Sequence, residues 1–131
     1  MKHIFRQGDT KQYRKTVQPG ETARFESGEV HPVYATFAIA KDAEWACRLF
    51  VLEMKDENEE GIGTRISVQH RAPALVGQDI VYTATVRSLA GSEIVCSFEA
   101  RVGERLIATG ETGQKILTKE KVTRLFESVK S

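Results

Sequence analysis

Three side chains have the chemistry of an acid–base site: Thr36, Glu44 and His70. A carboxylate and an imidazole can take up and return a proton during a reaction. A hydroxyl beside free backbone N–H groups can bind an oxygen that gains negative charge. Each of the three residues also has an ordinary structural interpretation. The elements that carry these residues decide between the two interpretations.

His70 ends a stretch in which polar and apolar residues alternate. Thr64, Ile66, Val68 and His70 have the same parity, so they share one face of a strand that is predicted to follow Gly63. Burial on an apolar face favours the neutral imidazole, which can accept a proton. The alternative is a core histidine whose ring is bonded to a backbone carbonyl. His70 is therefore a candidate base, although its position on a buried face does not by itself exclude the structural interpretation.

Glu44 lies within a helical pattern that is apolar on most of its circumference. It shares the narrow polar face with Lys41 and Arg48, which predicts exposed ion pairs worth no more than roughly 1 kcal/mol together. The neighbouring residues are apolar, among them Ala43 and Trp45. We therefore expect the carboxylate at the margin of a pocket, where it loses part of its water.

Thr36 stands where this helix, or the turn before it, begins. Threonine is a common helix N-cap, and that is its structural interpretation. The functional interpretation uses the same place, because free N–H groups at a helix start can bind a negative oxygen. Eight residues of continuous helix separate two side chains by about 12 Å. Thr36 must therefore precede the helix and fold back, or Thr36 and Glu44 must act from opposite sides of a bound group.

The elements that position these residues are predicted from periodicity and turn signals. A first strand covers 11–17 and ends at the Pro19-Gly20 turn, and 21–34 is predicted to be a loop with at most one helical turn. The long helix follows and ends in the acidic stretch 55–61. Later strands are predicted at 63–70, 79–89, 93–102 and 106–117, before a short amphipathic helix at 119–129. The pattern predicts an α+β fold whose curved antiparallel sheet wraps around the helix.

Composition narrows the function classes. The 131 residues predict a single domain, 1–131, of an ordinary globular composition. A net charge of +1 gives no broad basic surface for nucleic acid, and no segment is apolar enough for a signal peptide or a membrane span. We therefore expect a cytoplasmic protein without a nucleic-acid or membrane partner. Cys47 and Cys96 lack metal-site spacing, so we expect two buried apolar side chains. A sheet with one open edge favours a homodimer.

The motifs around the three candidates resemble those of a known family. They are Ala35-Thr36, Glu44-Trp45-Ala46-Cys47, and a Gly63-Thr64 strand that reaches His70 seven residues after its glycine. From about residue 30 to 117 the chain resembles the fluoroacetyl-CoA thioesterase-like family of hotdog proteins. The resemblance implies a dimeric hotdog thioesterase that hydrolyses acyl-CoA. It implies no metal, and no cofactor beyond the coenzyme A of the substrate.

The resemblance also implies roles for single residues. Thr36 would polarise the thioester or orient the carboxylate, Glu44 would be the nucleophile or general base, and His70 would take and return the proton. Gly63 would let the substrate approach the backbone. Val30 stands at the position of the family's aromatic gate of the acyl pocket. The family's late-strand histidine and arginine are absent from 110–114.

The expected function is therefore hydrolysis of a short- or medium-chain acyl-CoA, without a prediction of fluoroacetyl selectivity. Two alternatives come from other classes. One is a hotdog module that binds acyl-CoA without cleaving it. The other, ranked last, is hydration or dehydration of an acyl-CoA double bond.

Overall fold

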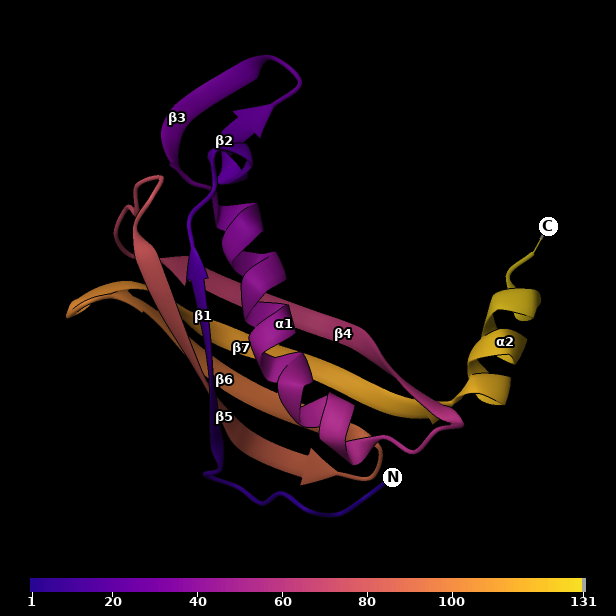
Figure 1. The fold of residues 1–131 in the computed structure, drawn as a ribbon. Helices are drawn as coiled ribbons and strands as arrows, with labels where there is room; N and C mark the ends of the chain where they lie inside the picture. Colours follow the sequence, from indigo (N-terminus) through magenta and orange to yellow (C-terminus); the bar gives the residue numbers. More distant parts are fainter. Residues whose placement is uncertain (131) are drawn as a thin grey trace.

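One antiparallel sheet and one long helix make up most of the protein. The computed structural model describes residues 1–130. The sheet has the strand order β1-β5-β6-β7-β4, and α1 (Thr36–Met54) lies across its concave face (Figure 1). The five strands are β1 (Thr10–Thr16), β5 (Asp79–Ala90), β6 (Glu93–Val102), β7 (Arg105–Thr118) and β4 (Glu59–His70). This arrangement confirms the predicted hotdog architecture.

The core lies between α1 and the inner face of the sheet. Alternate residues of β5 and β6 point toward the helix and are buried, as their period of two predicts. These residues are Ile80, Tyr82, Ala84 and Val86 of β5, and Ile94, Cys96, Phe98 and Ala100 of β6. Cys47 of α1 and Cys96 are both buried free thiols, which confirms the prediction for the two cysteines.

The apolar circumference of α1 is covered on one side only. The side that faces the sheet is buried, but Phe37, Trp45 and Leu52 remain 51%, 40% and 42% exposed. The helix therefore has an apolar side that its own sheet does not cover.

The loop predicted for 21–34 is wrong, because the structure has a β-hairpin there. A turn of 3₁₀ helix, η1 (Pro19–Glu21), leads into β2 (Thr22–Phe25), which pairs with β3 (Gly28–Tyr34). Gly28 has φ 111°, a value that suits glycine at the turn, and the hairpin forms a separate two-stranded sheet, where Pro32 is tolerated. The hairpin projects from the body of the protein beyond the start of α1 (Figure 1).

Strand β4 differs from the prediction in two ways. It begins at Glu59 rather than after Gly63, and the register with β7 shifts between Gly63 and Arg65. This bulge takes Thr64 out of the regular alternation that Ile66 continues. The strand pairs only with β7, so its other edge is free within the chain.

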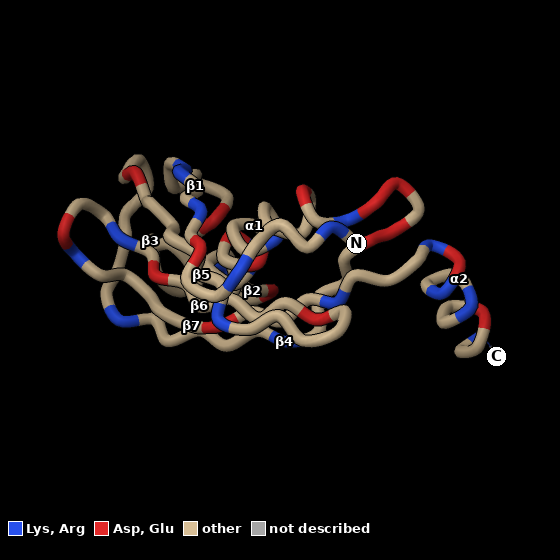
Figure 2. Tube along the Cα trace, turned by 90° about the horizontal axis from the view of Figure 1, so that it is seen from below, with Lys and Arg blue, Asp and Glu red and all other residues tan. Residues whose placement is uncertain are grey.

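The predicted C-terminal helix is confirmed as α2 (Lys119–Ser128), with Thr118 as its N-cap. The helix stands away from the sheet at the end of β7 (Figure 1). Charged residues of both signs lie along it (Figure 2). Within residues 1–130, neither helix combines the length and the hydropathy that crossing a bilayer requires.

Candidate functional site

The structure brings two of the predicted site residues together. Thr36 is the first residue of α1 and His70 is the last residue of β4, and Thr36 Oγ1 lies 2.9 Å from His70 Nδ1. Thr36 does not have the N-cap role of its structural interpretation, because Ala35 is the N-cap and has no side-chain cap bond. The Thr36 hydroxyl therefore bonds to the histidine and does not cap the helix. The first-turn N–H groups of α1 lie beside this pair and have no carbonyl partner within the helix.

The other ring nitrogen of His70 has no partner among the described residues. Nε2 is buried and makes no hydrogen bond, whereas Nδ1 is bonded to the Thr36 hydroxyl. A buried polar atom without a partner is costly, so such atoms are rare unless a ligand or a second chain supplies the bond. The orientation of the ring thus leaves one nitrogen for a further group.

Glu44 lies two turns further along α1, beside Gly63 of β4. A Cβ at Gly63 would overlap Oε1 of Glu44, so only glycine leaves room for the carboxylate there. Gln114 of β7 donates from Nε2 to the backbone carbonyl of Glu44 at 3.2 Å. In residues 1–130 no ion pair joins Glu44 to Lys41 or Arg48, so the predicted surface pairs are wrong.

Arg48 has a different partner. Its Nη1 donates to the carbonyl of Gly61 at 2.9 Å and ties the helix to the beginning of β4. The carboxylate of Glu44 is therefore left beside a cavity of about 570 Å³ that opens between α1, β1 and β4. The cavity is lined by three cations, three carboxylates, two aromatic rings and a glycine: Lys15, Lys41, Arg48, Glu21, Asp42, Glu44, Tyr13, Trp45 and Gly63.

A buried polar network lies at the far wall of this cavity. Asp42 of α1 accepts from the Tyr34 hydroxyl and pairs with Lys15 Nζ at 2.8 Å, and the hydroxyls of Tyr34 and Tyr82 lie 2.6 Å apart. Lys15 also pairs with Glu21 of η1. Burial opposes the charge of Lys15, but its bonds to Asp42 and Glu21 outweigh that effect and raise the pKa of the ammonium. Burial raises the pKa of Tyr34 and of Tyr82 above the ordinary tyrosine value.

Sequence reasoning missed this network. A charged Asp42 in the stripe of Ala38 and Ala46 was the available signal, because a carboxylate on a buried helix face needs a partner. The partners could not be found from the sequence, since they come from β1, β3 and β5. The network fastens the base of the hairpin to α1.

The family follows from comparison with known proteins. Residues 17–120 match a family model described as fluoroacetyl-CoA-specific thioesterase. This match spans most of the chain. The chain belongs to the fluoroacetyl-CoA-specific thioesterase family. A comparison with curated proteins gave no match.

Solved structures agree with this assignment. A Thermus thermophilus thioesterase superfamily member is 36% identical, with a TM-score of 0.92 over 97% of this chain and 94% of its own. The fluoroacetyl-CoA thioesterase FlK is 25% identical, with a TM-score of 0.88 over 97% of this chain and 98% of its own. A mutant of FlK crystallised with fluoroacetate and CoA is 27% identical, with a TM-score of 0.84 over 90% and 99% of the two chains. This family membership confirms the resemblance found in the motifs.

Val30, where the resemblance places the aromatic gate, lies on the hairpin. Val30 belongs to β3 and is 52% exposed. Close to the same hairpin, the rings of Phe25 and Phe37 meet edge to face with centroids 5.6 Å apart. Sequence reasoning did not single out these two rings, because the segment was predicted to be a loop.

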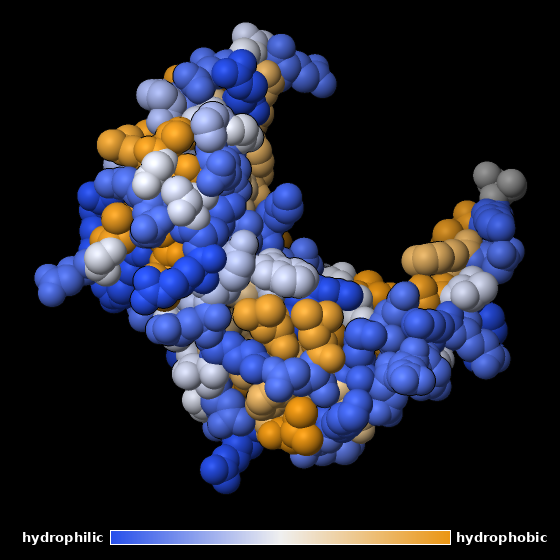
Figure 3. Space-filling view, in the orientation of Figure 1, coloured by the Kyte–Doolittle hydropathy of each residue, from blue (hydrophilic) through white to orange (hydrophobic). Residues whose placement is uncertain are grey.

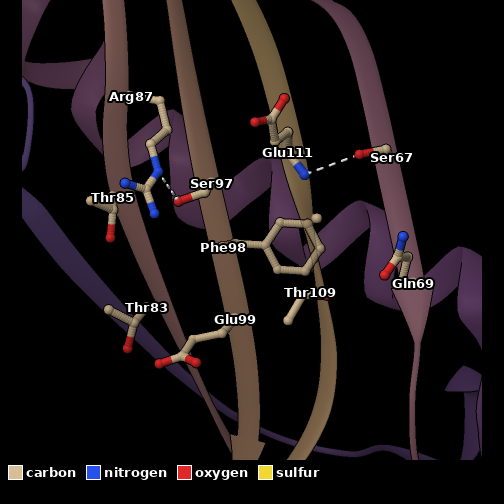
Figure 4. Close-up of a pocket in the computed structure, with 11 residues that line it drawn as sticks. Ser67, Gln69, Thr83, Thr85, Arg87, Ser97, Phe98, Glu99, Thr109 and Glu111 are labelled. Carbon is tan, nitrogen blue, oxygen red and sulfur yellow. Dashed lines mark hydrogen bonds between the residues drawn. The ribbon is translucent and has the colours of Figure 1, made fainter.

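A second cavity, of about 610 Å³, lies on the opposite face of the sheet. Its walls carry mainly hydroxyls, carboxylates and Arg87, whose Nε donates to Ser97 Oγ at 2.8 Å (Figure 4). The hydroxyl of Ser67 accepts from the backbone N–H of Glu111 at 3.2 Å. Ser67 and His70 have opposite parity on β4, so this cavity is separated from the candidate site by the sheet. Across residues 1–130, no three His, Cys, Asp or Glu side chains cluster closely enough to hold a metal ion.

Proposed function

We propose that this protein hydrolyses a short- or medium-chain acyl-CoA thioester to a free acid and coenzyme A, without a metal or an added cofactor. The observation that carries the proposal is the 2.9 Å bond between Thr36 Oγ1 and His70 Nδ1, in a chain of the thioesterase family. The relative crystallised with fluoroacetate and CoA supports a CoA thioester as the substrate class. We also propose a cytoplasmic location.

The active site is completed by a second protomer. Thr36 and Glu44 lie on one continuous helix, so about 12 Å of helical rise separates them. Acid–base groups must come within hydrogen-bond reach of one reacting group, directly or through a water molecule. One chain does not meet this requirement, whereas a dimer meets it if Glu44 of one protomer approaches Thr36 and His70 of the other.

The free edge of β4 supplies the geometry of this dimer. Two antiparallel β4 strands related by a twofold axis would join the two sheets. Their unpaired backbone N–H and C=O groups would then bond to each other. When His70 of one strand lies opposite Gly63 of the other, the bulge at Thr64 sets the axis at Ser67, with Ile66 opposite Val68. Glu44 adjoins Gly63 and is then carried to the His70 end of the partner's strand, where Nε2, which is buried within its own chain, must turn outward to meet the carboxylate. Ile66 is 42% exposed in the single chain and would be covered at the axis.

The chemistry follows from these positions. The first-turn N–H groups of α1 and the Thr36 hydroxyl bind the thioester oxygen, which becomes negative when the carbonyl is attacked. Glu44, as general base, removes a proton from a water molecule while that water attacks the carbonyl carbon. That proton passes from Glu44 to His70, and His70 donates it to the sulfur as the C–S bond breaks. The products are the carboxylic acid and the free thiol of CoA, so atoms and protons balance. If Glu44 is the nucleophile, the same groups serve a covalent intermediate.

Two family positions bear on substrate choice. Val30 offers a smaller side chain than an aromatic gate, so the acyl pocket has room for a longer chain than fluoroacetyl. Gly63 leaves the backbone open beside Glu44, where the thioester must lie. We therefore expect the highest kcat/KM on a short or medium unsubstituted acyl chain.

The test is release of free thiol from a panel of acyl-CoA esters. Glu44→Ala and His70→Ala each remove a proton-transfer group, so each lowers kcat/KM by ~10²–10⁴ without unfolding the protein. Glu53→Ala is the control, because it removes a carboxylate from the same helix outside the cavity, and it keeps wild-type activity. Wild-type rates from both site variants would overturn the proposal.

The binding-module alternative is favoured by one observation, the separation of Glu44 from Thr36 and His70 within a chain. A monomer with this arrangement would hold acyl-CoA but lack a complete site. In that case acyl-CoA raises the melting temperature of the protein, and the thioester remains intact after overnight incubation. An enoyl-CoA absorbance assay distinguishes hydration of a double bond from both functions.

A further inference from the structure

The C-terminal helix presents an apolar face that nothing in its own chain covers. Val122 is buried against the body of the protein, whereas Leu125, Phe126 and Val129 are 46%, 62% and 79% exposed. These four residues recur at helical spacing and form one stripe. An exposed stripe of three large apolar side chains on a projecting helix indicates a contact surface.

A second exposed apolar surface lies on the hairpin and the first turn of α1. Phe25, Val30 and Phe37 are 59%, 52% and 51% exposed, and we call these three residues the hairpin patch. The edge-to-face contact of Phe25 and Phe37 fixes the orientation of both rings. The patch adjoins Thr36, so a partner seated on it would also cover the candidate site.

Helix α2 and the hairpin stand at opposite ends of β4. The N–H of Lys119, at the start of α2, donates to the carbonyl of Asn58 at 2.7 Å, just before the strand begins. At the other end, Thr36 is bonded to His70. Both elements project on the same side of the molecule with an open space between them, and hydrophobic atoms are visible on both sides of this space (Figures 1 and 3). Within one chain the two surfaces do not meet.

The twofold axis of the proposed dimer brings the two surfaces together. Antiparallel pairing about Ser67 sets the beginning of one β4 beside the end of the other. The strand positions before Gly63 in one protomer then pass His70 of its partner and continue toward the base of the partner's hairpin. Because α2 starts beside Asn58, it is carried to the same place.

The charges around the two surfaces are complementary. Lys119 and Lys121 border the apolar stripe of α2, whereas Glu120 lies on the opposite side of the helix and pairs with Arg124 at 3.5 Å. The hairpin instead carries two exposed carboxylates, Glu26 and Glu29, and one arginine, Arg24. Arg24 pairs with Glu29 at 3.7 Å, so Glu26 is the carboxylate left to meet the lysines beside the stripe.

We propose that α2 of each protomer packs its apolar stripe against the hairpin patch of its partner and holds the hairpin over the shared active site. This inference rests on the dimer of the proposed function. It gives a specific role to a helix that contributes nothing to catalysis in its own chain. Val30 then belongs to a wall of the active site that the second protomer completes.

Disulfide trapping in the full-length protein tests the contact. The variant Phe25→Cys/Phe126→Cys is oxidised and analysed on a non-reducing gel, and Phe37→Cys/Phe126→Cys serves as a second pair. Thiols held together react at a high effective concentration, so covalent dimers form on the order of tenfold faster than in the matched control. That control is Phe25→Cys/Glu120→Cys, with the new thiol on the far side of α2. The native Cys47 and Cys96 are buried, so they do not compete.

Covalent dimers that form faster from either test pair than from the control and the single variants support the contact. Cross-linking of both pairs at no more than the control rate overturns it, as does a disulfide within one chain. Light scattering and thiol release are measured on the same preparations before oxidation. An active dimer that does not cross-link contradicts only the α2 contact, whereas an inactive monomer contradicts the proposed function itself.

Discussion

At the scale of single residues, Gly63 gives the most selective test of how the carboxylate is held. In Gly63→Ala the new Cβ would overlap Oε1 of Glu44, so the carboxylate must move away from its position. A displacement of about 1 Å in a catalytic group costs on the order of 10²-fold in rate, so kcat/KM for thiol release falls by that factor. Gly20→Ala is the matched control, because nothing lies within 4 Å of its Cβ. Equal activity of the two variants would contradict the position of Glu44.

The sequence identified these residues better than it identified their neighbours. Motif spacing pointed to Thr36, Glu44 and His70, and the first and last of these lie within a hydrogen bond of each other. Periodicity could not reveal the partners of Asp42, because a period describes one element and not its neighbours. It also could not decide whether Glu44 serves its own chain, since that depends on a second copy.

At the scale of elements, the network around Asp42 joins α1 to β1 and the hairpin. In Asp42→Ala the ammonium of Lys15, whose side chain is 12% exposed, loses a buried partner. Lys15 keeps its pair with Glu21, whereas the buried Tyr34 hydroxyl loses its acceptor; such a loss costs about 1–3 kcal/mol, so the free energy of unfolding in urea falls by that amount. Glu53→Ala breaks the more exposed pair with Lys11 and costs at most about 1 kcal/mol. Similar losses in both variants would show that the network is not a structural element.

The same network predicts how stability depends on pH. The pKa values of Lys15, Tyr34 and Tyr82 are all raised in the folded protein. A raised pKa gives stability that is complete below the unfolded value and is lost as the pH rises toward the folded value. Unfolded lysine and tyrosine titrate near pH 10, so the free energy of unfolding falls above about pH 10. Chemical denaturation at a series of pH values measures this dependence. A free energy of unfolding that rises above about pH 10 would contradict these shifts.

Elements with a regular period were predicted well, and irregular ones were not. Alternation in β5 and β6 gave their buried faces correctly, because one face of each strand is covered by α1 over most of its length. The hairpin was missed because Gly28 and Pro32 signal breaks, and in a projecting two-stranded sheet neither residue disrupts a central strand. The bulge beside Thr64 has no signal in a simple alternation.

At the scale of the whole molecule, the account requires a dimer through the β4 edge. In Ile66→Asp two carboxylates would meet near the twofold axis, so the protein becomes a monomer and thiol release is lost. Ile4→Asp places the same charge on an isoleucine that is 54% exposed elsewhere, and it leaves the dimer intact. Light scattering gives the mass, and far-UV circular dichroism verifies the fold. A dimeric, active Ile66→Asp protein would place the interface elsewhere.

The central claim is that two protomers share each thioesterase site, and mixing two inactive variants tests it most directly. Glu44→Ala and His70→Ala chains are coexpressed, and thiol release is compared with that of each variant alone. In a shared site the mixed dimer contains one intact set of Thr36, Glu44 and His70, so random pairing restores about a quarter of wild-type activity. If all three residues act within one chain, every site in the mixture lacks a residue. Activity no higher than that of the separate variants would contradict the shared site.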